Sequence, residues 1–261
     1  MNVIVCIKQV PETASVEIQA QSGTVVRAKG KPIINPFDMY ALEEGVRLKE
    51  GHGCKVSVLT MGPPEAEESL REALALGIDQ AFLLSDPRFD GSDTLATSHA
   101  LSRAIQMIGD PGIIICGRQS TDGSTGQVAP QLAEWLGMPF VASVNKIEEV
   151  AAGHLKLRRM DDEGHRIVEM SLPGVISVVK EINEPRLPSL RGLMQSKKAK
   201  IPVWTAADVE LDPAKVGLNG SATRISSAFF PDRNQKAELI EGDAAGQVDQ
   251  LIEKLRSAGA I

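Results

Sequence analysis

Four short apolar runs divide the first half of the chain and limit the folds that it can adopt. They cover residues 3–7, 56–59, 81–84 and 113–116, and Ser57 is the one polar residue among them. Such runs are typical of strands buried on both faces, because a strand with one wet face alternates apolar and polar residues. The pattern therefore predicts a parallel sheet that is covered on both sides.

Segments long enough to form helices lie between most of these runs and carry helix start and stop signals. A proline or an acidic residue opens each segment, and glycines follow the first two. Strands that alternate with helices form a parallel sheet with right-handed crossovers. We therefore expect an α/β fold, a doubly wound, mostly parallel sheet with helices on both faces. The expected helices begin at Pro36, Pro64 and Ser92 or Asp93.

Two stretches break this alternation and predict antiparallel hairpin additions to the sheet. Residues 15–28 alternate polar and apolar side chains around Ser22 and Gly23, and residues 153–171 do so around 162–164. Residues 175–179 form one further buried strand. Beyond them the periodicity weakens, which indicates a C-terminal arm that ends in an amphipathic helix at 243–257. The expected organisation is a nucleotide-binding domain over 1–182, a docking loop over 183–200 and an arm over 201–261.

The segment after the fourth apolar run is the first candidate ligand site. A strand ends at Gly117, a loop of small polar residues follows, and a helix continues through Trp135. Glycines in such a loop let the backbone approach a ligand, and the N–H groups of a helix start favour an anion such as phosphate. The segment matches neither GxxxxGK[ST] nor GxGxxG. A glycine-rich capping turn without a ligand remains the alternative.

Two more loops are expected at the same edge of the sheet. Residues 32–38 precede the first helix, where Asn35 is either a simple N-cap or part of a turn that closes over the nucleotide. Residues 60–64 follow the second run and precede the second helix. In open α/β sheets ligands bind beyond the carboxyl ends of the strands, so the three loops are predicted to line one site.

The segment 183–200 combines basic and apolar residues in an otherwise acidic chain of net charge -6. Five cations stand against Glu184, a local charge of +4, and leucines are interleaved with them. One interpretation is a surface helix with cations at its C-terminal end. The other is a docking loop, in which a leucine enters a partner's pocket and the cations steer an acidic surface. Nucleic acid is disfavoured, since aromatic residues are not interleaved with the cations.

Composition excludes several other classes of protein. With 43% hydrophobic residues the chain is not expected to be disordered, and no run reaches the ~18 apolar residues of a membrane span. The N-terminus is not expected to be a secretory signal. No catalytic group and no metal site are predicted, and the cysteines are expected to be small core residues of a cytoplasmic protein. The cysteines and histidines, which could serve as metal ligands or catalytic groups, are dispersed along the chain: Cys6, Cys54, Cys116, His52, His99, His154 and His165.

Five segments in this order resemble the β subunits of electron transfer flavoproteins. They are VCIKQV, NPFDMYALEEGVRLKE, TMGPPEAEESLREALALGID, GRQSTDGSTGQVAPQLAE and NEPRLPSLRGLMQSKKAK. The resemblance implies a heterodimer with an α subunit. In this heterodimer a redox-active FAD carries electrons from an acyl-CoA dehydrogenase or another flavoprotein dehydrogenase to an acceptor flavoprotein. It also implies that the β subunit binds AMP in most members. In the bifurcating members it binds a second FAD, which takes a hydride from NADH.

The resemblance also implies individual site residues. The short loop and its continuation QVAPQLAE look like the bifurcating type, which favours FAD over AMP and NADH as electron donor. Leu190 matches the leucine that enters a dehydrogenase pocket, and Arg191, Lys197 and Lys198 accompany it. A stand-alone nucleotide hydrolase and an ATP-sensing stress protein are the alternatives. The implied nucleotide contacts are Cys6, Asn35, Pro36, Phe37, Asp38, Met61, Gly117, Arg118, Gln119, Asp122, Gly123, Ser124, Thr125, Gly126, Gln127 and Val128.

Overall fold

A computed structural model describes residues 1–12, 16–18, 25–27, 32–226 and 238–261 of the chain. The chain divides into two compact units, Met1–Ser227 and Ala228–Ile261. Each unit is described here by itself.

The described strands of the first unit form a nine-stranded sheet in the order β11-β10-β9-β12-β8-β1-β6-β7-β13. In this order, every pair of neighbouring strands from β9 across to β13 is parallel. The two pairs at the other end, β11 with β10 and β10 with β9, are antiparallel. The predicted mostly parallel, doubly wound sheet is therefore confirmed. The strands are β1 (Asn2–Cys6), β6 (Lys55–Met61), β7 (Gln80–Leu84), β8 (Pro111–Gly117), β9 (Phe140–Ala151), β10 (His154–Asp161), β11 (Gly164–Ser171), β12 (Gly174–Val178) and β13 (Val203–Trp204).

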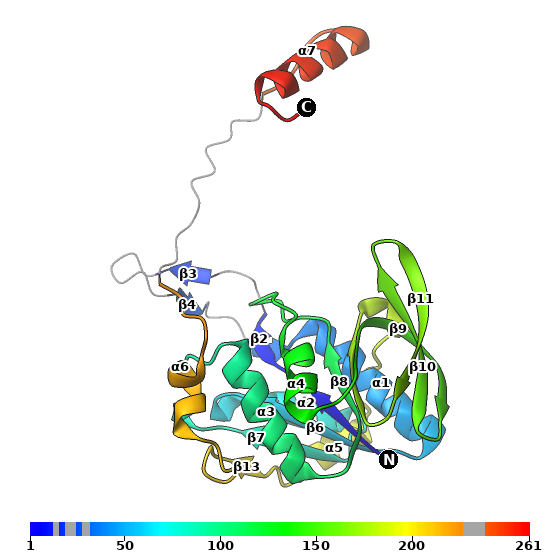
Figure 1. Cartoon of the computed structure of the whole chain (residues 1–261), viewed down its shortest axis with the longest axis vertical. Coiled ribbons are helices and arrows are strands. Elements are labelled where there is room, and N and C mark those ends of the chain that lie inside the picture. Colours follow the sequence, from blue (N-terminus) through cyan, green and yellow to red (C-terminus); the bar gives the residue numbers. More distant parts are fainter. Residues whose placement is uncertain (13–15, 19–24, 28–31, 227–237) are drawn as a thin grey trace. The chain divides into compact units, whose positions relative to one another are not determined.

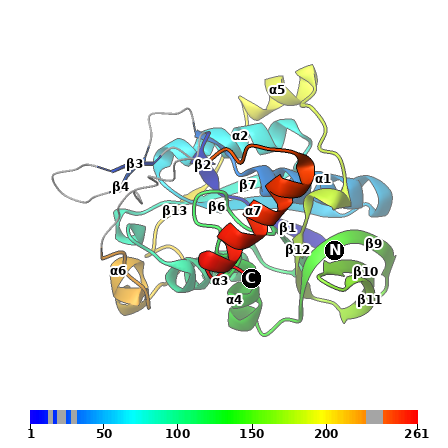
Figure 2. The same cartoon turned by 90° about the horizontal axis from the view of Figure 1, so that it is seen from above.

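Helices cover both faces of this sheet, as Figures 1 and 2 show. Alternate residues of β1 point to opposite faces, so that Val3 and Val5 pack with α1 and α2 while Ile4 packs with α3 and α4. Because both faces are covered, the central strands are apolar along their length. The helices are α1 (Pro36–His52), α2 (Glu67–Ala75), α3 (Thr94–Ile108), α4 (Val128–Leu136) and α5 (Leu190–Ser196), with short 3₁₀ turns at Pro64–Ala66, Pro87–Phe89 and Lys180–Ile182.

The helix ends follow local chemistry. The carboxylate of Asp93 accepts hydrogen bonds from the backbone N–H groups of Leu95 and Ala96 and so caps α3. Helix α1 runs past Gly51 and ends at Gly53, whose φ of 64° is the left-handed conformation that glycine adopts without strain.

The side of the sheet on which successive strands are added changes at β1. It passes from β1 outward to β6 and β7, and then returns through α3 to place β8 on the other side of β1. Cys6 of β1 is in register with Cys116 of β8, so the carboxyl ends of both strands reach the same edge. Ligands of doubly wound proteins bind at such a switch point.

The hairpin predicted over 153–171 is present as an antiparallel addition to the sheet, whereas the two strands within 15–28 pair with each other in a separate two-stranded sheet. β10 and β11 are joined through Asp162 and Glu163, since Asp161 pairs with Gly164. β3 (Val16–Ile18) pairs with β4 (Val25–Arg27), and the turn that we expected at Ser22 and Gly23 lies outside the described residues. The long strand β9 was not predicted. A further small sheet joins β2 (Gln9–Pro11) to β5 (Pro32–Ile34).

Residues 201–226 belong to the first unit, whereas we expected an arm to begin at 201. β13 pairs with β7, and the backbone N–H of Ser85 donates to the carbonyl of Trp204 at 2.9 Å. A 3₁₀ turn (Pro213–Lys215) and the short α6 (Gly217–Gly220) follow. This stretch is part of the first unit because four of its residues are buried in the core beside α3 and α4: Ala206, Val209, Leu211 and Val216.

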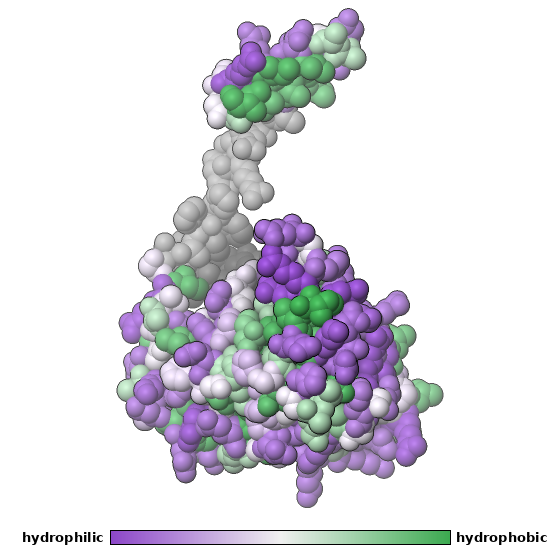
Figure 3. All heavy atoms as spheres, turned by 45° about the vertical axis from the view of Figure 1, so that its right-hand side comes forward, coloured by the Kyte–Doolittle hydropathy of each residue, from purple (hydrophilic) through white to green (hydrophobic). Residues whose placement is uncertain are grey.

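The second unit contains one described helix, α7 (Ala244–Ser257), which Asp243 caps by accepting from the N–H of Gly246. It confirms the expected amphipathic helix at 243–257. Val248 and Leu251 are exposed on it, and Figure 3 shows apolar side chains gathered along one side of the helix. None of the described helices is long and apolar enough to span a membrane.

The packing of 201–226 predicts how the chain tolerates truncation. A chain that ends at residue 200 loses β13 and the buried residues after it, and each buried Val or Leu contributes about 1.5–3 kcal/mol. We expect its urea midpoint to fall well below that of a matched control that ends at residue 226. Equal midpoints would show that 201–226 adds nothing to the core.

Candidate functional site

The N-terminus of α1 packs directly against the end of β8. A Cβ atom on Gly117 would lie 2.3 Å from Oδ1 of Asp38 and 2.7 Å from the carbonyl carbon of Phe37, so any larger residue there would displace the helix. Oδ2 of Asp38 accepts a 2.7 Å hydrogen bond from the N–H of Lys8, which follows β1. The buried carboxyl group thus joins the ends of β1 and β8 to α1.

Asn35 holds the loop between β8 and α4. Its Nδ2 donates to the carbonyl of Gln119 at 2.9 Å, and its Oδ1 accepts from the N–H of Thr121 at 3.1 Å. Its side chain therefore bonds to this loop rather than capping α1, although Asn35 directly precedes that helix. Asn35 is therefore the N-cap residue of α1 by position, as expected, but its side chain hydrogen-bonds the neighbouring loop instead of the helix.

A second fastening joins the end of β1 to the same loop. Nζ of Lys8 contacts both carboxylate oxygens of Asp122, at 2.7 and 2.6 Å. Burial alone would raise the pKa of Asp122, but the hydrogen bond and charge of Lys8 outweigh it and lower that pKa. Lys8 is a site residue that we did not predict; its position directly after the first strand was the available signal.

The start of α4 is the part of this edge best suited to an anion. The residue before the helix is Gln127, and no described side chain caps this N-terminus. Gly126 has a φ of 63° and Ser124 a φ of 51°, so the loop turns through left-handed conformations just before the helix. Among the described residues no side chain accepts from the N–H groups of Val128 and Ala129, whereas Asp93 accepts from the first N–H groups of α3. Pro130 has no N–H group, and that of Gln131 donates to the carbonyl of Gln127.

The other predicted contacts lie around this edge. Cys6 and Cys116 are buried neighbours on β1 and β8, and a hydrogen bond between the thiols, together with burial, raises the pKa of Cys116. Met61 ends β6, while 121–125 are exposed. The strand order thus brings the predicted residues of three loops and of the end of β1 to one edge of the sheet. Among the described residues, no group of three or more His, Cys, Asp or Glu side chains is placed to bind a metal ion.

The predicted docking segment packs against two helices, with the residues before α5 on α1 and α5 itself on α2. Leu190 begins α5, and Ser189 caps this helix by accepting from the N–H of Gly192 at 3.0 Å. The side chain of Leu190 is 83% exposed and that of Leu187 is 89% exposed. Lys197 and Lys198 directly follow the helix, while Arg191 lies within it.

The fold and this edge define a class: an open, doubly wound α/β protein whose switch point carries a loop and helix start suited to an anionic ligand. A family model described as an electron transfer flavoprotein domain matches residues 22–209. The chain belongs to the electron transfer flavoprotein family, as a β subunit.

Three relatives illustrate this membership. The electron transfer flavoprotein subunit beta of Thermoanaerobacterium thermosaccharolyticum is 42% identical over 262 residues and is covered completely, as is this chain. That of Megasphaera elsdenii is 42% identical, with 98% of each chain covered. A protein of Acetobacterium woodii named caffeyl-CoA reductase-Etf complex subunit CarD is 40% identical, with both chains covered completely. Membership in this family disfavours the stand-alone hydrolase and the stress protein.

The buried carboxyl group of Asp38 predicts a specific pH dependence of stability. Burial raises the pKa of Asp38 to about 7, although hydrogen bonds from Asn35, Lys8 and Gly117 partly oppose this. The folded state therefore retains a proton that the unfolded chain releases above about pH 4. This contribution to stability is fully present below pH 4 and is lost as the pH rises through 7.

The Asp38→Asn variant removes this titration. We expect its free energy of unfolding to change less between pH 4 and 7 than that of the natural chain. The pKa difference between 3.8 and about 7 corresponds to about 4 kcal/mol. Urea denaturation at several pH values measures both slopes, and identical slopes would refute a proton on folded Asp38.

Proposed function

We propose that this chain is the nucleotide-binding β subunit of a heterodimeric electron transfer flavoprotein and that an adenine nucleotide binds at the switch point between β1 and β8. The observation that carries the proposal is the uncapped start of α4, among the described side chains, behind a loop of small residues. N–H groups at such a helix start bind phosphate, and the helix dipole favours its charge.

The residues at this edge fit a nucleotide. Thr125 offers a hydroxyl donor, and Gly126 lets the backbone approach a pyrophosphate closely. The hydroxyl of Ser124 donates to the carbonyl of Ser120 at 3.3 Å and would exchange this bond for one to the ligand. Asn35, Asp38 and Lys8 hold the loops that carry these groups. A bound FAD supplies reversible one- and two-electron transfer, so the chain itself needs to bind and orient rather than to provide an acid or a base. The proposed contacts are those of Cys6, Asn35–Asp38, Met61 and 117–128.

We assign FAD rather than AMP to this site, with NADH as the electron donor. The loop from Asp122 to Thr125 and its continuation through Pro130 look like those of the bifurcating members. One relative is itself named as a subunit of a caffeyl-CoA reductase-Etf complex, which supports a place in a complex with a flavoprotein dehydrogenase.

This assignment predicts two FAD per heterodimer. Extraction of the purified complex should release both, and NADH should bleach the flavin absorbance with no dehydrogenase present. One FAD and one AMP, without a response to NADH, would exclude the bifurcating type.

The Gly126→Ala variant should lower the nucleotide content, because the φ of 63° at position 126 strains any larger residue. Gly51→Ala, which lies on α1 outside the proposed contacts and whose Cβ would meet nothing within 4 Å, is the matched control.

The partner of the described apolar face on α7 is proposed to be the α subunit. Val248, Leu251, Ile252 and Leu255 recur at helical spacing, and α7 contains no buried residue among those described. Such a face is typical of a helix that buries its apolar side against another chain.

The free thiols of three buried cysteines support the expectation of a reducing compartment such as the cytoplasm.

Helix α5 is proposed to dock on a flavoprotein dehydrogenase through Leu190. An exposed leucine beside cations combines an apolar anchor with electrostatic steering. Arg191, Lys197 and Lys198 would steer an acidic partner surface.

The Leu190→Ala variant tests this docking. We expect the concentration of acyl-CoA dehydrogenase at half-maximal electron transfer to rise about thirtyfold, as for an anchor worth about 2 kcal/mol. Folding and flavin content should not change, because the side chain packs on little of this chain. Met107→Ala, which removes an exposed apolar side chain from α3 on the opposite face, is the control. An unchanged half-maximal concentration in Leu190→Ala would refute the docking role.

A further inference from the structure

Helix α5 is held in place almost without apolar packing. It has seven residues, too few to be stable as an isolated helix in water. Within α5, all of which the structure describes, Ser196 is the one buried residue, and Leu190 and Met194 are exposed. Since apolar burial cannot fix this helix, polar contacts must do so.

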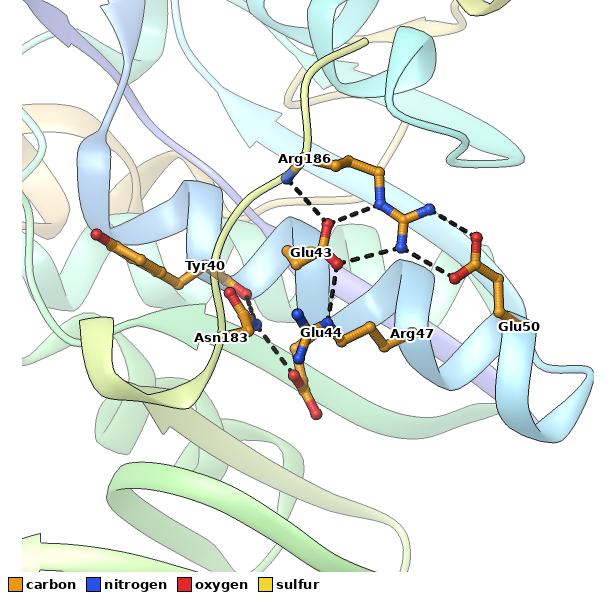
Figure 4. Close-up of polar contacts among 7 residues, drawn as sticks. All are labelled: Tyr40, Glu43, Glu44, Arg47, Glu50, Asn183 and Arg186. Carbon is orange, nitrogen blue, oxygen red and sulfur yellow. Dashed lines mark hydrogen bonds and ion pairs between the residues drawn. The ribbon is translucent and has the colours of Figure 1, made fainter. Parts of the chain in front are cut away.

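The strongest of these contacts is an ion-pair clamp at Arg186, four residues before α5 (Figure 4). Its Nε and Nη2 donate to the two carboxylate oxygens of Glu43, at 2.8 and 3.1 Å. Nη1 and Nη2 donate to the two oxygens of Glu50, at 2.6 and 2.9 Å. One planar guanidinium group therefore bridges two carboxylates on α1, an arrangement that a lysine cannot reproduce.

The environment makes this clamp more than a surface ion pair. The side chain of Glu43 is only 5% exposed, and that of Arg186 is 33% exposed. Burial alone would raise the pKa of Glu43, but the hydrogen bonds from Arg186 and Arg47 outweigh it and lower that pKa. Asn183 adds hydrogen bonds from its Nδ2 to the carbonyl of Tyr40 and to Glu44, both at 3.0 Å.

The far end of α5 is fastened to α2. Nη1 of Arg71 donates to the carbonyl of Ser196 at 2.6 Å, where the helix ends. In the middle, a Cβ on Gly192 would lie 2.1 Å from the carbonyl oxygen of Ala75, so the two backbones are in direct contact. The segment is thus tied to α1 before the helix and to α2 along and after it.

The cations of this segment differ in whether they are paired with acids. Arg186 is neutralised by two acids, whereas Arg191, Lys197, Lys198 and Lys200 form no ion pair with the described residues. The exposed face of α5 therefore combines Leu190 and Met194 with unneutralised cations. A surface already ordered in this way loses less conformational entropy when a partner binds.

We propose that Arg186 is a positioning residue for docking: by bridging Glu43 and Glu50 it presents Leu190 of α5 to an acidic, apolar-pocketed flavoprotein partner in a preformed orientation. The proposal rests on the docking role of Leu190 described above.

The test uses the complete heterodimer and acyl-CoA dehydrogenase as the probe. Arg186→Met should raise the dehydrogenase concentration at half-maximal electron transfer about tenfold and leave the maximal rate and flavin content unchanged. The variant is expected to fold because Arg47 still donates to Glu43 at 2.9 Å. Arg186→Lys should recover only part of the loss. Arg47→Met, which removes a partner of the same carboxylate but no tie to the docking segment, is the matched control and should have little effect.

A double-mutant cycle separates positioning from a general structural effect. If Arg186 acts through Leu190, Arg186→Met should cost less than about twofold when Leu190 is already alanine. Trypsin should also cleave after Arg191 and Lys197 faster in Arg186→Met than in Arg47→Met, because the released segment opens more often.

The possible outcomes are distinct. Full additivity of the two changes, or unchanged cleavage and half-maximal concentration in Arg186→Met while Leu190→Ala is impaired, would overturn the positioning role and leave docking intact. An unimpaired Leu190→Ala would instead refute the docking function itself.

Discussion

The rest of the structure depends on β1 lying between β6 and β8. Its parallel pairing on both sides makes it the centre of the sheet, with alternate side chains in the two apolar layers. The same arrangement brings Lys8, Asp38 and Gly117 together, since the ends of β1 and β8 meet only where the chain reverses its direction of growth. The candidate ligand edge is therefore a consequence of strand order rather than of any single motif.

Carboxyl groups hold the irregular segments in place through hydrogen bonds, whereas packed apolar side chains stabilise the sheet. Asp38 joins the strand ends to α1, and Asp93 caps α3 while it also accepts from the N–H of Thr223 at 2.9 Å. Asp86 accepts from the N–H of Ala206, and Glu43 holds the approach to α5 through Arg186. Each carboxyl group replaces backbone bonds that a loop cannot make with itself, which keeps these segments in one conformation.

The sequence predicted best those structural features that depend on residues close together in the chain. The four apolar runs predicted the central strands, and Asp93 and Gly53 marked helix ends, because these signals depend on neighbours in the chain. The packing of Val209 and Leu211 was missed, since irregularly spaced apolar residues carry no period. The clamp of Arg186 on Glu43 could not be predicted, because its partners are 143 positions apart and only the fold brings them together. The roles of Asn35 and Lys8 were hidden for the same reason.

The order of strands in the sheet also affects how the chain folds as it is synthesised. β1, β6 and β7 leave the ribosome first and can pair with one another, whereas β8 pairs with β1 across more than a hundred residues. Until 111–117 emerge, one edge of the strand that later becomes the centre of the sheet exposes unpaired N–H and C=O groups. The nascent protein thus passes through a stage in which the central strand of its sheet is open to pairing with other chains, and a chaperone would have its greatest effect in that interval.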